Sequence, residues 1–284
     1  MRLITSTFTF SDSAVIPYYE IESQERDKTK TVIVGIHGLM SDLDYWKRLA
    51  DNLTVLASVD VHLPILRGYT NAETKKGDIP NAGQYDNDLV EILQELEHEY
   101  ERIVLIGHST GAANVCRILN AGRLPVKTEK IILAAPFLHP ALPVNREISN
   151  QENGSDSWAV YSKRAKFYHI WANINPFFQG RAPVVKVPVR DVPYDASSQV
   201  YPYELSYRLV MSRFIDLKHT NWQLFAKSSV FIGSADEVID SEKLKQLWKD
   251  KTGTDMHTVD SEDHNSLLTS PPFMQHILES VRLL

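Results

Sequence analysis

Hydrophobic and polar positions alternate along the chain on two different scales. Residues 31–36, 102–106 and 130–134 are short, almost continuously apolar runs, which are typical of strands buried on both faces of a parallel sheet. Residues 86–100 instead carry apolar side chains at helical spacing, with carboxylates on the opposite face. This alternation of strands and helices predicts a mostly parallel sheet with helices on both faces.

The remaining elements extend this sheet at both ends. Residues 3–10 and 15–21 are rich in β-branched and aromatic residues and are separated by a polar turn, so they predict an antiparallel hairpin. After a long interruption, the strand and helix signals resume at residue 228 and continue to a C-terminal helix. The other predicted strands are 55–61, 228–232 and 256–259, and the other predicted helices are 45–53, 112–121, 243–251 and 273–283.

The interruption at residues 137–227 has a different composition. Strand-like apolar runs are absent, prolines and aromatic residues are frequent, and basic residues outnumber acidic ones. We interpret this segment as a cap, or lid, inserted after the sixth strand and packed over the carboxyl edge of the sheet. Residues 1–136 and 228–284 then form the core domain. The aromatic side chains of the cap either line an apolar pocket or form the cap's own small core.

Composition and charge exclude several classes of protein. The chain has 284 residues and a formal net charge of −6, which provides no electrostatic footprint for nucleic acid. Its single cysteine, Cys116, excludes an internal disulfide and a thiolate metal cluster. Residues 1–7 lack the apolar core of a signal peptide, and no apolar run is long enough to span a bilayer. We therefore expect a soluble, cytoplasmic protein without stable membrane insertion.

The segment around Ser109 has the pattern of a nucleophile elbow. Gly107-His108-Ser109-Thr110-Gly111 lies between a predicted strand and a predicted helix. In such an elbow the chain reverses so sharply that only small residues fit two positions before and after the serine. The turn lifts the hydroxyl clear of the sheet and places it at a helix N-terminus, where free N–H groups favour negative charge.

Two further residues complete a candidate catalytic triad with Ser109. Asp236 and His264 each follow a late strand of the predicted sheet, and the carboxyl ends of parallel strands meet at one edge. A serine hydroxyl needs an adjacent base, which a third group orients. His264 would take the proton from Ser109, and Asp236 would fix the imidazole tautomer. Glu237 and Asp240 are alternative acids.

An acyl-transfer site also needs two preorganised N–H donors for the oxyanion. The backbone amide of Thr110, directly after the nucleophile, is the first candidate. The second should come from the turn after residues 31–36, where Gly38 allows a close approach of the chain. We expect this donor to be the Leu39 amide, with Met40 as the alternative.

Two histidines flank these tight turns. His37 precedes the predicted oxyanion turn and His108 precedes the nucleophile. We interpret both as turn and core residues rather than as catalysts. The alternative is that His37, Gly38, Met40 and His108 contact the substrate.

These motifs resemble those of the serine α/β-hydrolases of the monoacylglycerol lipase, lysophospholipase and carboxylesterase group. His37-Gly38-Leu39 resembles their oxyanion turn, and the residues around Ser109 resemble their elbow. Gly233-Ser234-Ala235-Asp236 is similar to their acid loop, and Asp263-His264 is similar to their base loop. Leu63-Pro64-Ile65-Leu66-Arg67-Gly68 resembles the Pro-x-x-x-Gly stretch of bacterial carboxylesterases. The resemblance implies an α/β-hydrolase fold over residues 30–135 and 228–284.

The chain departs from this group in two places. Arg67-Gly68-Tyr69-Thr70 lacks the second glycine and the serine that the group usually carries in this loop. The cap is also longer than usual in the group. The resemblance therefore implies fold and ester-cleaving chemistry but leaves the substrate open.

The expected function is hydrolysis of a carboxylic ester through an acyl-enzyme. The resemblance implies a small-molecule ester such as a monoacylglycerol, a lysophospholipid or a short-chain ester, and it implies no metal, nucleotide or flavin. Alternatives on the same triad are a thioesterase, an acyltransferase, or an aminopeptidase or amidase. Asp191, Asp195 and Glu204 are the acidic residues that could bind a substrate amine. An alternative of another class is a non-catalytic binding protein.

Overall fold

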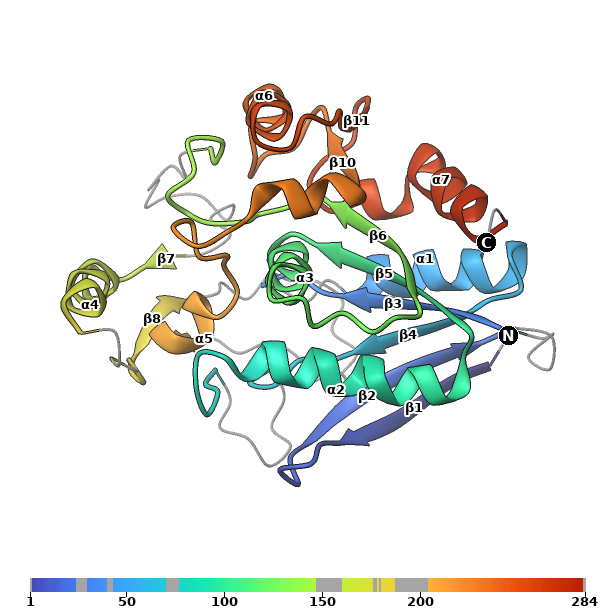
Figure 1. Ribbon diagram of the computed structural model, residues 1–284, viewed down its shortest axis with the longest axis horizontal. Helices are drawn as coiled ribbons and strands as arrows, with labels where there is room; N and C mark the ends of the chain where they lie inside the picture. The colour runs from blue at the N-terminus through green and yellow to red at the C-terminus, as the bar shows by residue number, and fades with distance from the viewer. Residues whose placement is uncertain are drawn as a thin grey trace.

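The computed structural model of the protein describes residues 2–23, 30–39, 43–69, 77–146, 160–175, 178, 180–186 and 204–282 (Figure 1). Within these residues an eight-stranded sheet has the order β1-β2-β4-β3-β5-β6-β10-β11. β1 pairs antiparallel with β2, and β2 pairs antiparallel with β4, whereas the other pairs are parallel. The strands are β1 (Arg2–Thr9), β2 (Val15–Glu22), β3 (Thr31–Ile36), β4 (Asp60–Pro64), β5 (Arg102–His108), β6 (Thr128–Ala134), β10 (Ser229–Gly233) and β11 (His257–Val259).

The sheet confirms the predicted α/β architecture, including the antiparallel hairpin at its start. All six residues of β3 are buried, as are six of the seven residues of β5, which accounts for their continuous apolar sequence. β3 and β5 are neighbours in the middle of the sheet. The loops that follow them therefore leave the same edge side by side.

Helices cover both faces of this sheet. α2 (Gln84–Glu99) and α3 (Thr110–Asn120) lie against one face, and α1 (Leu43–Leu56) lies against the other (Figure 1). α1 packs on α7 (Pro271–Arg282) and on the short helix η3 (Ser266–Thr269). α6 (Ser241–Thr252) lies between β10 and β11 along the chain.

One predicted strand is wrong in its position. Residues 55–61 were expected as a strand because they are apolar, but Val55 and Leu56 are the last residues of α1 and β4 begins at Asp60. Val55 is 69% exposed and Leu56 is 54% exposed. These two residues are therefore apolar without being buried in the sheet. The helix extends to them because Leu53 and Thr54, just before them, still face the core.

The segment between β6 and β10 contains a second, three-stranded antiparallel sheet. Figure 1 places it beside the edge of the main sheet toward which β3 and β5 run. Sequence periodicity missed its strands, because runs of two to four residues are too short to show alternation. The described elements are β7 (Val160–Tyr161), α4 (Lys163–Ile174), β8 (Pro183–Lys186), β9 (Glu204–Ser206), α5 (Tyr207–Met211) and the short helix η2 (Trp222–Lys227).

Several aromatic side chains of this segment pack on one another. The Tyr168 ring lies 5.0 Å from Phe178 and 5.7 Å from Tyr207. Phe225 of η2 stacks on Trp248 of α6 at 6.2 Å. These rings build a local core within the segment and a contact with α6. A core of this kind is what the second interpretation of the aromatic residues expected.

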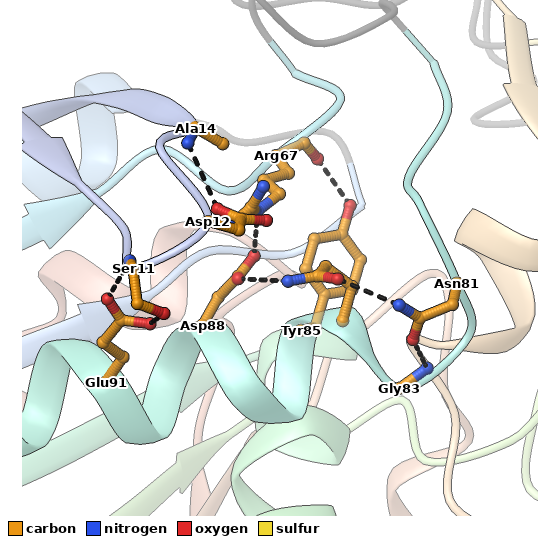
Figure 2. Close-up of polar contacts among 10 residues, drawn as sticks. Ser11, Asp12, Ala14, Arg67, Asn81, Gly83, Tyr85, Asp88 and Glu91 are labelled. Atoms are coloured by element: carbon orange, nitrogen blue, oxygen red, sulfur yellow. Dashed lines mark hydrogen bonds and ion pairs between the residues drawn. The ribbon is translucent and has the colours of Figure 1, made fainter.

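A buried arginine ties the turn of the first hairpin to α2 (Figure 2). Arg67 follows β4, and its Nε donates to Asp88 Oδ2 of α2 at 2.7 Å. Its Nη2 donates to Asp12 Oδ1, in the turn between β1 and β2, at 2.8 Å. The guanidinium also lies 4.4 Å from the centre of the Phe10 ring. This residue occupies the loop in which the sequence departs from the carboxylesterase pattern.

Replacing this arginine is expected to destabilise the fold strongly. Arg67→Met keeps the length of the side chain but leaves the Asp88 carboxylate buried without its cation. Such a change costs about 3–5 kcal/mol, measurable by urea unfolding. Burial raises the pKa of Asp88 to about 6. Arg67 lowers this pKa through its hydrogen bond and charge, so Arg67→Met should raise it further. The cost should therefore shrink as the pH falls toward about 6, where Asp88 becomes protonated in both proteins and no longer needs the cation.

The matched control for this change is Asp12→Asn. The Asp12 side chain is 46% exposed, so its ion pair is screened by solvent. We expect its loss to cost less than about 1 kcal/mol. Equal effects of the two substitutions would contradict a dominant Arg67–Asp88 pair.

Candidate active site

Ser109 lies at a sharp turn between β5 and α3. It has φ 53° and ψ −124°, a backbone conformation that non-glycine residues rarely adopt. The turn is held by the Ser109 amide, which donates to Ala134 O at 3.0 Å, and by the Ser109 carbonyl, which accepts from Phe137 N at 3.1 Å. Strain of this kind persists only where the surrounding structure imposes it, and it is typical of functional sites.

The two glycines of the elbow are required by close backbone contacts. A Cβ on Gly107 would lie 2.6 Å from Ala112 Cα, and a Cβ on Gly111 would lie 2.1 Å from Ile36 O of β3. Neither contact can be relieved by moving a side chain, because each added Cβ would meet a backbone atom. The predicted need for small residues two positions before and after Ser109 is confirmed.

The structure brings Asp236 and His264 together at the same edge of the sheet. Asp236 follows β10 and His264 follows β11, and His264 Nδ1 lies 2.9 Å from Asp236 Oδ2. The other carboxylate oxygen, Oδ1, accepts from Val238 N at 2.8 Å and from Ile239 N at 2.7 Å. These bonds fix the plane of the carboxylate, so Oδ2 faces the imidazole. Nδ1 then carries the proton, and Nε2 is the nitrogen available as a base.

The two alternative acids have other partners. Glu237 Oε2 accepts from the backbone N of His264 at 3.0 Å and thus holds the base loop. Asp240 Oδ1 accepts from Lys243 N at 3.1 Å, which makes Asp240 the N-cap of α6. Among the three acids, Asp236 is therefore the one hydrogen-bonded to the His264 ring.

The charge of Asp236 dominates the electrostatics of this pair. Burial alone would lower the pKa of His264, but the neighbouring Asp236 carboxylate and its hydrogen bond outweigh burial and raise that pKa. Burial likewise opposes the ionised form of Asp236, whereas His264 and the two backbone amides keep the pKa of the carboxyl low. Asp236 is thus ionised at neutral pH and stabilises a protonated His264.

His108 links the loop that carries His264 to β5, the strand that leads to Ser109. His108 directly precedes Ser109, and its Nε2 donates to the backbone oxygen of His264 at 2.8 Å. The rings of His108 and His264 lie 5.0 Å apart. Burial lowers the pKa of His108 to about 3, so this ring is a neutral donor. His108 therefore holds the base loop against the elbow.

The turn after β3 runs beside Ser109. A Cβ on Gly38 would lie 2.9 Å from Ser109 Cβ, so only a glycine allows this approach. His37 Nε2 accepts from Leu66 N at 3.1 Å, which leaves the proton on Nδ1, and Nδ1 donates to Gly38 O at 2.7 Å. Burial and the nearby charge of Arg213 lower the pKa of His37 to about 3, so the ring is neutral.

This hydrogen bond orients a peptide unit next to Ser109. The Gly38 carbonyl and the Leu39 N–H belong to one planar trans peptide and point in opposite directions. By holding the carbonyl, His37 directs the Leu39 N–H away from its own ring. The amide of Thr110 begins α3, and the first amides of a helix have no intrahelical partner. The Leu39 and Thr110 amides thus belong to the two segments that lie beside Ser109.

Other predicted residues are placed less directly. Met40 lies outside the described residues, as do Asp191 and Asp195. The observed partners of His37 and His108 are backbone groups, which suits their interpretation as turn and core residues. Cys116 is a free, buried thiol in α3, and burial raises its pKa. In the described part of the chain, no cluster of His, Cys, Asp and Glu could hold a metal ion.

Sequence reasoning missed the residues that support the site from a distance. Arg146 Nε donates to the Asp236 backbone oxygen at 2.9 Å, and Glu237 holds the His264 amide. Arg213, from the segment between β6 and β10, reaches the turns on both sides of Ser109. No local pattern marks these side chains, because each contacts a residue far away in sequence.

Similar structures share this architecture. A soluble variant of monoglyceride lipase from Saccharomyces cerevisiae, in complex with a substrate analog, is 15% identical and has a TM-score of 0.68; the match covers 100% of this chain and 94% of that chain. A monoacylglycerol lipase from Paleococcus ferrophilus is 17% identical with a TM-score of 0.62, covering 94% and 98%. A meta-cleavage product hydrolase is 13% identical with a TM-score of 0.63, covering 99% of both chains.

The eight-stranded, mostly parallel sheet with its elbow after β5 is an α/β-hydrolase fold. Residues 27–180, more than half of the chain, match the family described as serine aminopeptidase, S33, and the chain belongs to that family. Among curated proteins none matches this chain. No helix within the described residues is long and apolar enough to cross a membrane.

Proposed function

We propose that the protein hydrolyses carboxylic esters through an acyl-enzyme on Ser109. Ser109 attacks the ester carbonyl while His264 Nε2 takes its proton, and the amides of Leu39 and Thr110 bind the oxyanion. His264 then gives the proton to the leaving alcohol, and a water activated by the same nitrogen releases the acid. Asp236 holds the tautomer and stabilises the imidazolium throughout.

The observation that carries this proposal is the buried pair of Asp236 and His264 at the sheet edge that also holds the strained Ser109. The pair supplies an oriented base, and the elbow supplies a half-buried nucleophile at a helix N-terminus. A monoacylglycerol, lysophospholipid or short-chain ester is the proposed substrate class. The names of the monoacylglycerol lipases among the similar structures support this class.

Peptide cleavage is the second candidate, because the family is described as serine aminopeptidase. An aminopeptidase needs a carboxylate that binds the free amine of its substrate. Near the base, Glu237 is already occupied by the His264 amide. Glu204 is exposed and lies 3.9 Å from Lys186. A substrate amine would have to compete with the His264 amide for Glu237 and with Lys186 for Glu204, so we keep the ester as the first candidate.

The test compares p-nitrophenyl esters of increasing acyl length with aminoacyl p-nitroanilides, together with fluorophosphonate labelling and peptide mapping. We expect ester hydrolysis, with the label on Ser109, and little cleavage of the anilides. Faster cleavage of the anilides would favour the aminopeptidase. An unlabelled, inactive protein would favour a binding protein on a hydrolase fold. The best acyl length would then measure the depth of the pocket.

A further inference from the structure

Arg213 joins the two turns on either side of the nucleophile. Its Nε donates to Thr110 Oγ1 at 3.1 Å, and its Nη2 donates to the same oxygen at 2.9 Å. Nη2 also donates to the backbone oxygen of His37. One guanidinium thus contacts the segment that carries the Leu39 amide and the residue that carries the Thr110 amide.

The guanidinium is deeply buried, and the described part of the chain places no counter-charge beside it. Arg213 is 0% exposed, and the described residues offer it no carboxylate within ion-pair distance. Its cation lies 5.3 Å from the Tyr85 ring centre and 5.8 Å from that of Tyr69. Its remaining nitrogen, Nη1, is buried without a hydrogen-bond partner among the described residues. Burying an arginine without a carboxylate is costly, and such a cost is unexpected for a purely structural side chain.

We infer that Arg213 is a positioning residue for the oxyanion site. This inference depends on the proposed function. By holding the His37 carbonyl and the Thr110 hydroxyl together, the guanidinium fixes the separation and orientation of the two backbone donors. Its positive charge, which no described carboxylate neutralises, also favours a developing oxyanion at these donors, because charges interact more strongly in a buried environment than in water.

The origin of this arginine gives the arrangement a second consequence. Arg213 follows α5, and its neighbour Ser212 accepts a hydrogen bond from Asn114 Nδ2 of α3 at 2.9 Å. The segment between β6 and β10 therefore contributes to the geometry of the oxyanion donors, which otherwise come from the core sheet. The donors would be correctly spaced only when this segment is in place.

The experiment measures p-nitrophenyl ester hydrolysis by Arg213→Met, Arg213→Lys and Thr110→Val. We expect Arg213→Met to lower kcat about 10- to 100-fold and to change KM less than about threefold, since removal of a whole oxyanion donor costs about 10²–10³. Arg213→Lys keeps the positive charge but cannot contact Thr110 and His37 in the same way. Its kcat should lie between that of wild type and that of Arg213→Met. Thr110→Val removes one acceptor and keeps the side-chain shape, so it should lower kcat as well.

Two readouts separate positioning from a structural role. The affinity for an alkyl boronic acid, which forms a tetrahedral adduct on the serine, should fall by the same factor as kcat/KM. Affinity for the product acid, which lacks the oxyanion, should stay within about threefold. The double variant Arg213→Met/Thr110→Val should be no worse than Arg213→Met, because both changes remove one shared contact.

The inference is overturned if folded Arg213→Met keeps the kcat of wild type, or if its loss lies entirely in KM. If Arg213→Met does not fold, Thr110→Val provides the test, since it only replaces a hydroxyl by a methyl group. Full kcat in Thr110→Val would then overturn the inference. Ser109→Ala distinguishes failure of the proposed function from failure of the inference about Arg213. An active Ser109→Ala contradicts the proposed function, whereas an inactive Ser109→Ala beside a fully active Arg213→Met contradicts only the role of Arg213.

Discussion

Ser109→Ala is expected to lower kcat for ester hydrolysis by about 10⁶-fold, since removing the nucleophile of a serine hydrolase leaves only the contribution of binding and oxyanion donors. The structure gives the physical reason. The serine side chain lies beside Gly38 and at the N-terminus of α3, whereas the other hydroxyl of the elbow, that of Thr110, accepts hydrogen bonds from Arg213. Steady-state hydrolysis of the best p-nitrophenyl ester measures the effect. A loss of less than about a thousandfold would contradict Ser109 as nucleophile.

The backbone of Ser109 provides a control that separates chemistry from folding. Because φ is 53° at this position, Ser109→Gly should be as inactive as Ser109→Ala but more stable, by about 1 kcal/mol. Ser228→Ala is the matched control for loss of a buried hydroxyl. The Ser228 hydroxyl has no hydrogen-bond partner within the described residues and lies outside the site. Its removal should leave kcat unchanged.

Asp236→Asn is expected to lower kcat/KM by about 10³–10⁴-fold near neutral pH. An amide in place of the carboxylate can donate to His264 Nδ1, which favours the tautomer with its proton on Nε2. That nitrogen can then no longer accept a proton from Ser109. The imidazolium also loses the charge that stabilises it. Comparison of initial rates with wild type measures the effect.

The pH profile of the same pair of proteins tests the cause. His264 must be neutral to act as a base, so activity should be low in acid and rise with pH through the His264 pKa. In wild type the Asp236 carboxylate holds this pKa above its ordinary value of 6.5, and in Asp236→Asn the apparent pKa should be lower. Asp240→Asn, which alters the N-cap of α6, should keep the wild-type profile. An unchanged apparent pKa in Asp236→Asn would contradict the assignment of the acid.

Much of the fold could be predicted from local patterns. The apolar runs of β3 and β5 reflect burial on both faces of the sheet, a property that each residue contributes independently. The elbow glycines were predictable because the steric demand of a sharp turn acts on neighbouring positions. Local patterns failed at Val55 and Leu56, where apolar residues lie on the exposed end of a helix.

Sequence order alone left three acids available to His264. Asp236, Glu237 and Asp240 are close in sequence, and only the turn after β10 determines which carboxylate faces the ring. The same holds for His37 and His108. Their chemistry suits catalysis, but tertiary structure buries both and engages them with backbone groups.

By itself the sequence determined the α/β class, the position of the elbow at Ser109 and the steric requirement for glycine around it. These features depend on hydrophobic periodicity and on backbone geometry within a few residues. Only the tertiary structure decided that Arg67 pairs with Asp88 and that Arg213 reaches both Thr110 and His37. The physical reason is that a buried charge is satisfied by groups that folding brings together from distant parts of the chain, and no local pattern encodes which groups those are.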